Sequence, residues 1–382
     1  MSYTCPYCFT PVDPLDIWFQ CSVPTCAQAD EIRTKFENGL QRQQPLPQGT
    51  RLVNYNTTFQ GQGGVCPKCQ RTTSIRACPI CHTSLPPGIN NLQNAVFAVV
   101  GASSTGKSHY IAVLLDQLKK LYGKFNWSLT ALNDETMSLY REKYYNPLFY
   151  EHKTIGTTQG ARGNADVKKP LVYLLNIYGT DKSVVLAFFD AAGEDLRNSD
   201  NMSVMNKYIA YSSGIILLLD PLQIENIRGK IHSSNMLEQS LTAHQNDMLN
   251  NIILLHKRIH YNNSSTKQIP LAVVLSKIDL LQQILAEEFF RFEEPIKHPK
   301  GAINIEELNS NSGWIKRWLE NEGAECIQLH KEFTTSFFAV SALGGDPKKI
   351  DGTDVIPGGP KPMHVEDPFL WLLYKNGFIQ GK

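Results

Sequence analysis

Residues 98–110, AVVGASSTGKSHY, contain the residue types that bind phosphate groups. Gly101 is followed by four residues and then by Gly106, Lys107 and Ser108, which is the pattern G-x-x-x-x-G-K-[ST]. Glycines let such a loop wrap closely around phosphate oxygens, which its N–H groups and lysine bind, and the serine hydroxyl is placed to ligate Mg²⁺. The pattern predicts a nucleotide site, the alternative being an ordinary Gly/Ser-rich turn. The other predicted nucleotide-binding residues of this loop are Ser103, Ser104, Thr105 and His109.

Cysteines form the second chemical signal, because eight of the nine precede residue 82. Paired thiolates on short turns are typical of tetrahedral Zn²⁺ sites, and four thiolates leave no open position for catalysis. We therefore predict two structural zinc sites, with redox pairs as the minor alternative. The eight ligands are Cys5, Cys8, Cys21, Cys26, Cys66, Cys69, Cys78 and Cys81.

The grouping of these cysteines is open. The simplest grouping is sequential, with the first four cysteines in one site and the last four in the other. A cross-braced grouping would instead place Cys5 and Cys8 with Cys66 and Cys69. His82 is a less favoured substitute ligand, and Cys326 is expected to be a buried helix residue.

Three later strings carry further candidate groups. In FFDAAGED (188–195), Asp190 ends a predicted strand and can hold Mg²⁺ through water, while the N–H of Gly193 can approach a γ-phosphate. In LSKID (275–279), Asp279 can accept two hydrogen bonds from guanine, a pattern that adenine does not offer. In VSALG (340–344), the Ala342 N–H would face the guanine carbonyl, with Ser341 and Leu343 beside it.

These residues need a sheet that brings strand ends together. Short apolar runs predict strands at 95–101, 171–178, 183–190, 213–220, 271–277 and 334–342, with the second and third forming a hairpin. Helical spacing of apolar residues is found at 107–123 and 234–260, and a last helix is predicted with Asp367 as its cap. Alternating strands and helices indicate an α/β fold with a mostly parallel sheet that is covered on both faces.

The ordered set of phosphate loop, DxxG, [NTS]KxD and SAx resembles the Ras-like GTPases of the translation-factor-related (TRAFAC) class over residues 95–382. The resemblance implies a Ras-like P-loop domain with a six-stranded sheet, one strand antiparallel, and GTP or GDP with Mg²⁺ as cofactors. With zinc ribbons in front, the chain also looks like bacterial double-GTPase proteins of conflict systems.

Two positions depart from the family pattern. The usual Asn of the guanine motif is Ser276, followed by the expected Lys277. Glu194 stands where Ras-like hydrolases have Gln, and a carboxylate only accepts hydrogen bonds and faces the negative γ-phosphate. The sequence therefore predicts slow intrinsic hydrolysis.

The segment before the hairpin is expected to carry the first switch loop. Residues 125–132 predict an added strand, 133–150 a helix and 151–164 a polar loop. Thr157 is the preferred Mg²⁺-binding threonine, with Thr158 and Thr154 as alternatives, or the loop contacts no magnesium. Arg162 can act as an internal arginine finger or be merely solvated.

Length and composition limit the organisation. The 382 residues predict a first zinc ribbon at 1–30, an irregular arm at 31–60, a second ribbon at 61–88 and a GTPase domain at 92–382 with a switch insertion at about 124–165. A net charge of +1 gives no general attraction to nucleic acid or membranes. We expect a cytoplasmic GTP-hydrolysing switch with a protein partner. The alternative is a hydrolysis-poor scaffold whose ribbons bind protein or nucleic acid, and an ATPase is the weakest reading.

Overall fold

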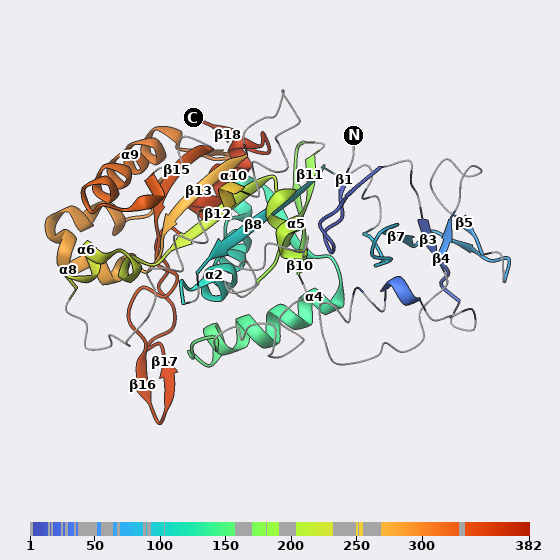
Figure 1. Cartoon of the computed structure of the whole chain (residues 1–382), viewed down its shortest axis with the longest axis horizontal. Helices are drawn as coiled ribbons and strands as arrows, with labels where there is room; N and C mark the ends of the chain where they lie inside the picture. Colours follow the sequence, from blue (N-terminus) through green and yellow to red (C-terminus); the bar gives the residue numbers. More distant parts are fainter. Residues whose placement is uncertain are drawn as a thin grey trace.

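A computed structural model describes residues 3–13, 16, 18–23, 26, 30–33, 36, 52–54, 64–66, 69–86, 89, 93–102, 104–156, 170–180, 182–190, 204–231, 250, 252–254, 269–327 and 333–382. Its centre is a seven-stranded sheet in the order β15-β13-β12-β8-β11-β10-β9 (Figure 1). These strands are β8 (Gln93–Gly101), β9 (Trp127–Ala131), β10 (Leu171–Ile177), β11 (Lys182–Phe188), β12 (Gly214–Leu219), β13 (Pro270–Leu275) and β15 (Thr334–Ala339).

The sheet confirms the predicted Ras-like α/β class. Strands β11, β8, β12, β13 and β15 are mutually parallel, whereas β10 is antiparallel to β11. The seventh strand, β9, is the one predicted at 125–132, and it pairs antiparallel with β10 at the sheet edge.

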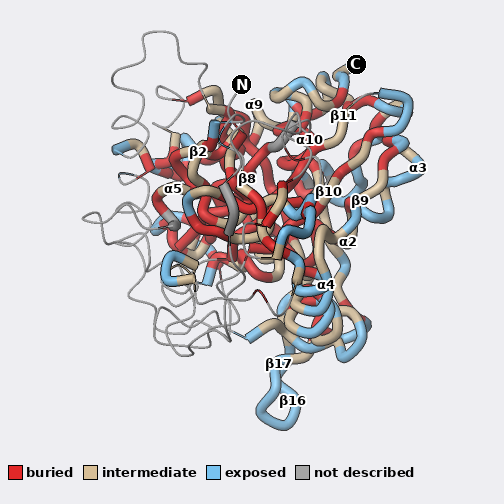
Figure 2. Tube along the Cα trace, turned by 90° about the vertical axis from the view of Figure 1, so that its right-hand side faces the viewer, coloured by how far each residue is buried: buried red, intermediate tan, exposed pale blue. Residues whose placement is uncertain are grey.

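Side chains of β8 alternate between two cores, as the period of two in a strand requires. Ala95, Phe97 and Val99 pack on one face, where α2 (Lys107–Lys120) and α10 (Asp367–Lys375) lie. Val96, Ala98 and Val100 pack on the other, against α5 (Val204–Ala210) and much of α9 (Ile305–Asn321). Figure 2 shows buried residues concentrated in the central strands, whereas the edge strand β9 is largely half-buried.

The helix predicted at 133–150 is continuous but changes type. It begins as α4 (Asp134–Leu139), capped by the Asn133 side chain, and continues as a π-helix, η3 (Tyr140–Tyr150), with Pro147 inside it. The helix predicted at 234–260 is described only at 250 and 252–254, where it is helical. Single-turn π segments are frequent near functional sites, so an eleven-residue one directs attention to what its side chains reach.

Smaller elements complete the part of the chain that surrounds the large sheet. A two-stranded hairpin projects from it and is exposed (Figures 1 and 2). It comprises β16 (Lys348–Ile350) and β17 (Thr353–Val355). The others are α3 (Tyr122–Phe125), η6 (Pro221–Gln223), α6 (Glu225–Arg228), η7 (Ile278–Leu281), α8 (Gln282–Leu285), η8 (Ala286–Phe292), β14 (Ala302–Ile303) and β18 (Gln380–Gly381).

Short strands carry the cysteine region. Strand β1 pairs with β2, β5 pairs with β6, and β3 lies between β4 and β7. Their bounds are β1 (Tyr3–Thr4), β2 (Pro11–Val12), β3 (Trp18–Gln20), β4 (Leu52–Asn54), β5 (Gly64–Val65), β6 (Thr72–Thr73) and β7 (Arg76–Ala77). In Figure 1 strands β3, β4 and β5 lie in the part of this region that is distant from the large sheet, whereas β1 lies beside β8.

One expected cap differs. Asp367 is the first residue of α10 rather than its cap, because its carboxylate accepts hydrogen bonds from two buried histidines. His298 Nε2 lies 3.2 Å from Asp367 Oδ1, and His364 Nδ1 lies 2.7 Å from Oδ2. Among the described residues, no helix has both the length and the apolar character needed to cross a membrane.

Candidate functional site

The predicted motifs meet at one edge of the sheet. The phosphate loop, Asp190, the 275–279 string and the 340–344 string follow β8, β11, β13 and β15, which are parallel strands. Parallel strands end on the same side, and ligands of such sheets bind there. The order of elements therefore places the predicted phosphate-binding and base-binding groups around a common edge of the sheet.

The phosphate loop has the backbone that its glycines permit. Gly106 has φ +84°, a left-handed conformation, and caps α2. A Cβ on Gly101 would lie 2.6 Å from Thr105 Oγ1 and 2.9 Å from the Leu218 carbonyl, so only glycine fits there. Lys107 is buried, and its ammonium donates to the carbonyls of Gly101 (2.9 Å) and Ala102 (3.1 Å).

Ser108 and Asp190 form the part of the site suited to magnesium. Ser108 Oγ donates to Asp190 Oδ2 at 2.6 Å, and both side chains are buried. Tyr144, from the π-helix, also donates to this oxygen at 3.3 Å. Burial and the Asp190 charge raise the pKa of the Tyr144 hydroxyl, so it remains a donor. Burial lowers the pKa of Lys107, and the Asp190 carboxylate opposes that shift.

His109 links the phosphate-loop helix to the segment before the predicted switch. Its Nε2 accepts a hydrogen bond from the Ile155 N–H at 3.0 Å. Burial, with a smaller contribution from the Lys277 charge, lowers the pKa of His109 to about 4, so the ring is neutral and accepts. Thr154, the second alternative switch threonine, donates its N–H to the Asp354 carbonyl of β17 at 3.0 Å.

The predicted guanine-binding residues also lie together. Asp279 hydrogen-bonds with the Ser341 side chain; burial raises the pKa of Asp279, and this bond opposes the rise. Ser276 Oγ donates to the Leu219 carbonyl at 2.9 Å, so it braces the end of β12. Lys277 has φ +51° and pairs with Asp220 at 2.6 Å.

A further segment holds the 341–343 loop in place. The Ser341 N–H and C=O both bond to Met363, and the Leu343 carbonyl accepts from the Lys361 N–H at 2.8 Å. Gly344 has φ +76°, and a Cβ there would lie 2.1 Å from the Lys361 carbonyl. The loop that carries Ala342 is thus fixed on both sides.

Cysteine grouping differs from both predicted groupings. One cluster joins Cys5 and Cys8 to Cys78 and Cys81, and the other joins the inner cysteines, Cys21, Cys26, Cys66 and Cys69. The reason is non-local pairing, because β3, which precedes the inner cysteines, pairs with β4 and β7 from much later in the chain. Local CxxC spacing contains no signal for this pairing.

Both clusters fit a tetrahedral metal. The sulfurs of each cluster lie within 4.8 Å of one another, with Cys5–Cys81 and Cys8–Cys78 at 3.8 Å and Cys21–Cys69 at 3.7 Å. Four thiolates at about 2.3 Å from a tetrahedral Zn²⁺ are about 3.8 Å apart. Burial raises the pKa of the Cys5 and Cys81 thiols, which a bound cation would counteract.

Three of the cysteine turns share a backbone feature that sequence reasoning missed. These turns, called knuckles below, lie at residues 5–8, 66–69 and 78–81. The residue after the second cysteine is left-handed in each: Phe9 (φ +56°), Gln70 (φ +57°) and His82 (φ +57°). His82 is not in either sulfur cluster, because its Nδ1 pairs with Asp30 at 2.9 Å.

Several predicted residues lie outside the described ones: Ser103, Thr157, Thr158, Arg162, Gly193 and Glu194. Their roles stay predictions. Conversely, Tyr144 contacts Asp190 and was not predicted, and Gly344 lies in the predicted 340–344 string, but its contact with Lys361 was not expected. Tyr140 and Tyr144 are four residues apart and share a face, which is the signal that could have identified the π-helix as facing the site.

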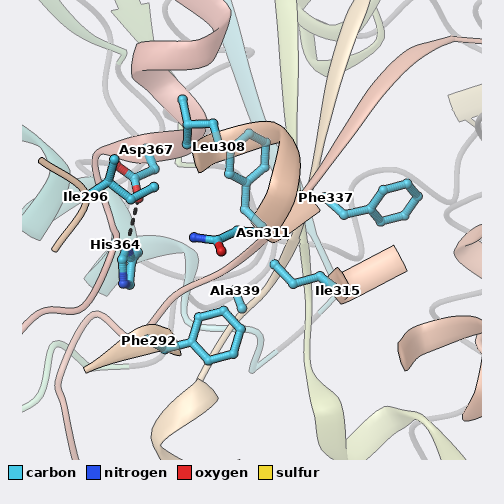
Figure 3. Close-up of a pocket in the computed structure, with 10 residues that line it drawn as sticks. Phe292, Ile296, Leu308, Asn311, Ile315, Phe337, Ala339, His364 and Asp367 are labelled. Atoms are coloured by element: carbon cyan, nitrogen blue, oxygen red, sulfur yellow. Dashed lines mark hydrogen bonds and ion pairs between the residues drawn. The ribbon is translucent and has the colours of Figure 1, made fainter. Parts of the chain in front are cut away.

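A small cavity lies elsewhere, between α9, β15 and the 364–367 segment (Figure 3). Its lining is mostly apolar, with Asn311, His364 and Asp367 as the polar members. None of its lining residues comes from the phosphate loop, Asp190 or the 275–279 string, so it is separate from the site described above.

Comparison with known proteins identifies the family of the chain. The model of the Double-GTPase 2 family matches residues 95–332. A protein of Mycolicibacterium smegmatis, "Putative ESX-1 scaffolding and assembly protein SaeC", is 29% identical over 409 aligned positions, covering 98% of this chain and 99% of that one.

Two solved structures illustrate more distant similarity. The bacterial selenocysteine-specific elongation factor EF-Sec is 14% identical with a TM-score of 0.30, covering 74% of this chain but 29% of its own. The GTP-bound GTPase-like domain of S. cerevisiae Ski7 is 13% identical with a TM-score of 0.32, covering 75% and 50%. Such scores are too low to compare individual residues. The family match spans more than half of the chain, and the strand order is consistent with it. This chain therefore belongs to the Double-GTPase 2 family.

Proposed function

We propose that this protein binds GTP with Mg²⁺ and acts as a slow GTP-hydrolysing switch. The observation that carries the proposal is the 2.6 Å bond between Ser108 and Asp190, with buried Lys107 on the same loop. A hydroxyl and a carboxylate from two different elements meet at the position where a phosphate-bound Mg²⁺ requires both. Asp279 on its Ser341 support supplies the base preference.

Each residue then has a stated role. Lys107 would exchange its loop carbonyls for β- and γ-phosphate oxygens, and the loop N–H groups would hold the same phosphates. Ser108 and Asp190, and Thr157 from the first switch, would place Mg²⁺. Gly193 would contact the γ-phosphate, and Glu194, in place of the usual Gln, is the reason to expect slow cleavage.

The test is single-turnover cleavage of GTP and of ATP by the zinc-loaded full chain with Mg²⁺. We expect GTP to bind and be cleaved slowly, ATP to bind weakly, and Lys107→Ala to lose binding. We also expect Glu194→Gln to speed cleavage. Failure of GTP to bind, or equal binding of ATP, would overturn the proposal.

A second candidate is a GTP-binding scaffold that hardly hydrolyses its nucleotide. Glu194 favours it, as does the name of the Mycolicibacterium relative, which describes scaffolding and assembly. In both candidates the cysteine region would contact a protein partner. GTP that stays bound and intact for hours, with Glu194→Gln also inactive, would favour the scaffold.

A further inference from the structure

The pairing of strands β8 and β11 ends just before the candidate nucleotide site. The side chain of Tyr208 lies between the two strands at this point, which is called the fork below. Their ladder ends at the pair Val96 and Ala187. Beyond it, the hydroxyl of Tyr208 donates to the Phe97 carbonyl at 2.7 Å and accepts from the Val99 and Phe189 N–H groups at 3.1 Å each. Tyr208 is 0% exposed, so these three bonds replace the missing ladder in a site closed to water.

This fork sets the spacing between the two halves of the magnesium-binding part. Val99 lies two residues before Gly101, where the phosphate loop begins, and Phe189 lies directly before Asp190. A change in the separation of β8 and β11 here is passed on to the 2.6 Å contact between Ser108 and Asp190. Tyr208 would therefore act indirectly, through the two backbones that lead to the phosphate loop and to Asp190.

The outer cysteine cluster, formed by Cys5, Cys8, Cys78 and Cys81, is linked to this fork by a neighbouring aromatic residue. Phe9, which follows Cys8, is 0% exposed and lies with its ring centroid 4.7 Å from that of Tyr208 and 5.8 Å from that of Phe189. The knuckle holds Phe9 in its left-handed conformation through the bond from the Phe9 N–H to the Cys5 carbonyl (2.9 Å).

Two polar contacts accompany this packing. Lys207, next to Tyr208 in α5, donates to Thr10 Oγ1 at 3.2 Å. On its other side the knuckle reaches the switch insertion, where Asn133 Nδ2 donates to the Tyr7 hydroxyl at 3.2 Å. Asn133 is the residue that caps α4. The outer knuckle thus contacts the elements that lead to both predicted switches.

We propose that the metal held by Cys5, Cys8, Cys78 and Cys81 sets the magnesium affinity of the nucleotide site, with Phe9 and Tyr208 as the positioning residues between them. The proposal rests on the proposed function, because it concerns Mg²⁺·GTP at the same site. It assigns the outer cluster a role in nucleotide binding beyond holding the N-terminal region together.

The inner cluster provides a matched comparison. Its cysteines form a hydrophobic cluster of their own with Val23, and the left-handed residue of its knuckle, Gln70, is exposed. Gln70 and Phe9 occupy the same position of the same turn, so substituting both by leucine changes the same backbone site. Only one of the two substitutions removes a ring from the fork.

The test measures GTP affinity of the zinc-loaded full chain with Mg²⁺ and in buffer to which no Mg²⁺ is added. We expect Tyr208→Phe and Phe9→Leu each to reduce the gain in affinity that Mg²⁺ provides by about tenfold, because the first removes the hydroxyl that bonds to both strands and the second removes the ring packed on it. Affinity without Mg²⁺ should stay unchanged, and Gln70→Leu should match the wild type in both conditions. General destabilisation would lower the folded fraction without altering the ratio of the affinities with and without Mg²⁺. Phe9→Tyr keeps an aromatic ring at this position, so its ratio should equal that of the wild type.

A second readout uses the reciprocity of coupled sites. Mg²⁺·GTP should slow zinc release to a chelator from one of the two clusters in the wild type, and Phe9→Leu should abolish the slowing. An unchanged magnesium gain in folded, zinc-loaded Tyr208→Phe and Phe9→Leu would overturn the inference while leaving GTP binding intact. A wild type that binds no GTP would instead refute the proposed function.

Discussion

Gly344 offers a sharp test of how the base-binding loop is held. It follows Ser341, Ala342 and Leu343 and has φ +76°, which L side chains rarely adopt. Placing a methyl group there in Gly344→Ala would bring Cβ to 2.1 Å from the Lys361 carbonyl oxygen and 2.8 Å from Lys361 Cβ. The backbone of one of the two segments must therefore move.

The cost has two parts. A left-handed conformation costs a non-glycine residue about 1–2 kcal/mol. Forcing an extra methyl group into packed atoms costs about 1–3 kcal/mol more. We expect Gly344→Ala to lower the free energy of unfolding by about 2–5 kcal/mol and to weaken GTP binding, because Leu343 and the adjacent Ala342 N–H move with the loop.

Gly345 is the matched control. A Cβ on Gly345 meets no atom within 4 Å, so Gly345→Ala should change stability by less than about 0.5 kcal/mol. Urea unfolding and nucleotide titration of both variants measure the difference. Equal stability of the two alanine variants would refute the argument that Lys361 clamps this loop.

Three further predictions follow. Asp279→Ala should reduce the preference for GTP over ATP by about 100-fold or more, measured by competition binding, and unchanged discrimination would sink the base assignment. Elemental analysis should find two zinc ions per chain, one for each cysteine cluster, and chelation should make the cluster thiols reactive; a single ion would remove one site. Because folding lowers the His109 pKa from 6.5 to about 4, the unfolded chain binds the proton more readily, so stability is lost as pH falls from 6.5 toward 4. His109→Gln should lose about 3 kcal/mol less of its unfolding free energy than the wild type over this pH range, measured by urea unfolding at several pH values. An identical pH profile for the two proteins would contradict the lowered pKa of His109.

Sequence reasoning identified those parts of the fold that local patterns determine. Apolar runs such as 214–219 and 270–275 are buried on both faces and can only be central strands. The phosphate loop and Asp279 stand out in the sequence because binding of phosphate and of guanine would restrict the residue type at each position. The structure brings them to one edge of the sheet, and their roles in nucleotide binding stay predictions.

Other features depend on distant parts of the chain. The pairing of the cysteines depends on β3 meeting β7, and CxxC spacing is the same whichever partner is chosen. Tyr208 and Phe9 carry no motif, since any buried aromatic residue has the same sequence signature. The π-helix begins at Tyr140 within a pattern that also suits an α-helix. The spacing of Tyr140 and Tyr144 marks a shared face, but it does not show that the Tyr144 hydroxyl donates to Asp190.

The nested cysteine clusters also have a consequence for how the N-terminal region folds. Cys8 and Cys78 are 70 residues apart, and Cys21 and Cys69, inside them, are 48 apart. Because the entropy cost of closing a loop grows with its length, loading the inner site first leaves only the short segments 9–20 and 70–77 for the outer site to close. Metal loading should therefore proceed from the inside outward. The knuckle that carries Phe9 would then be completed last, after the rest of the N-terminal region has formed.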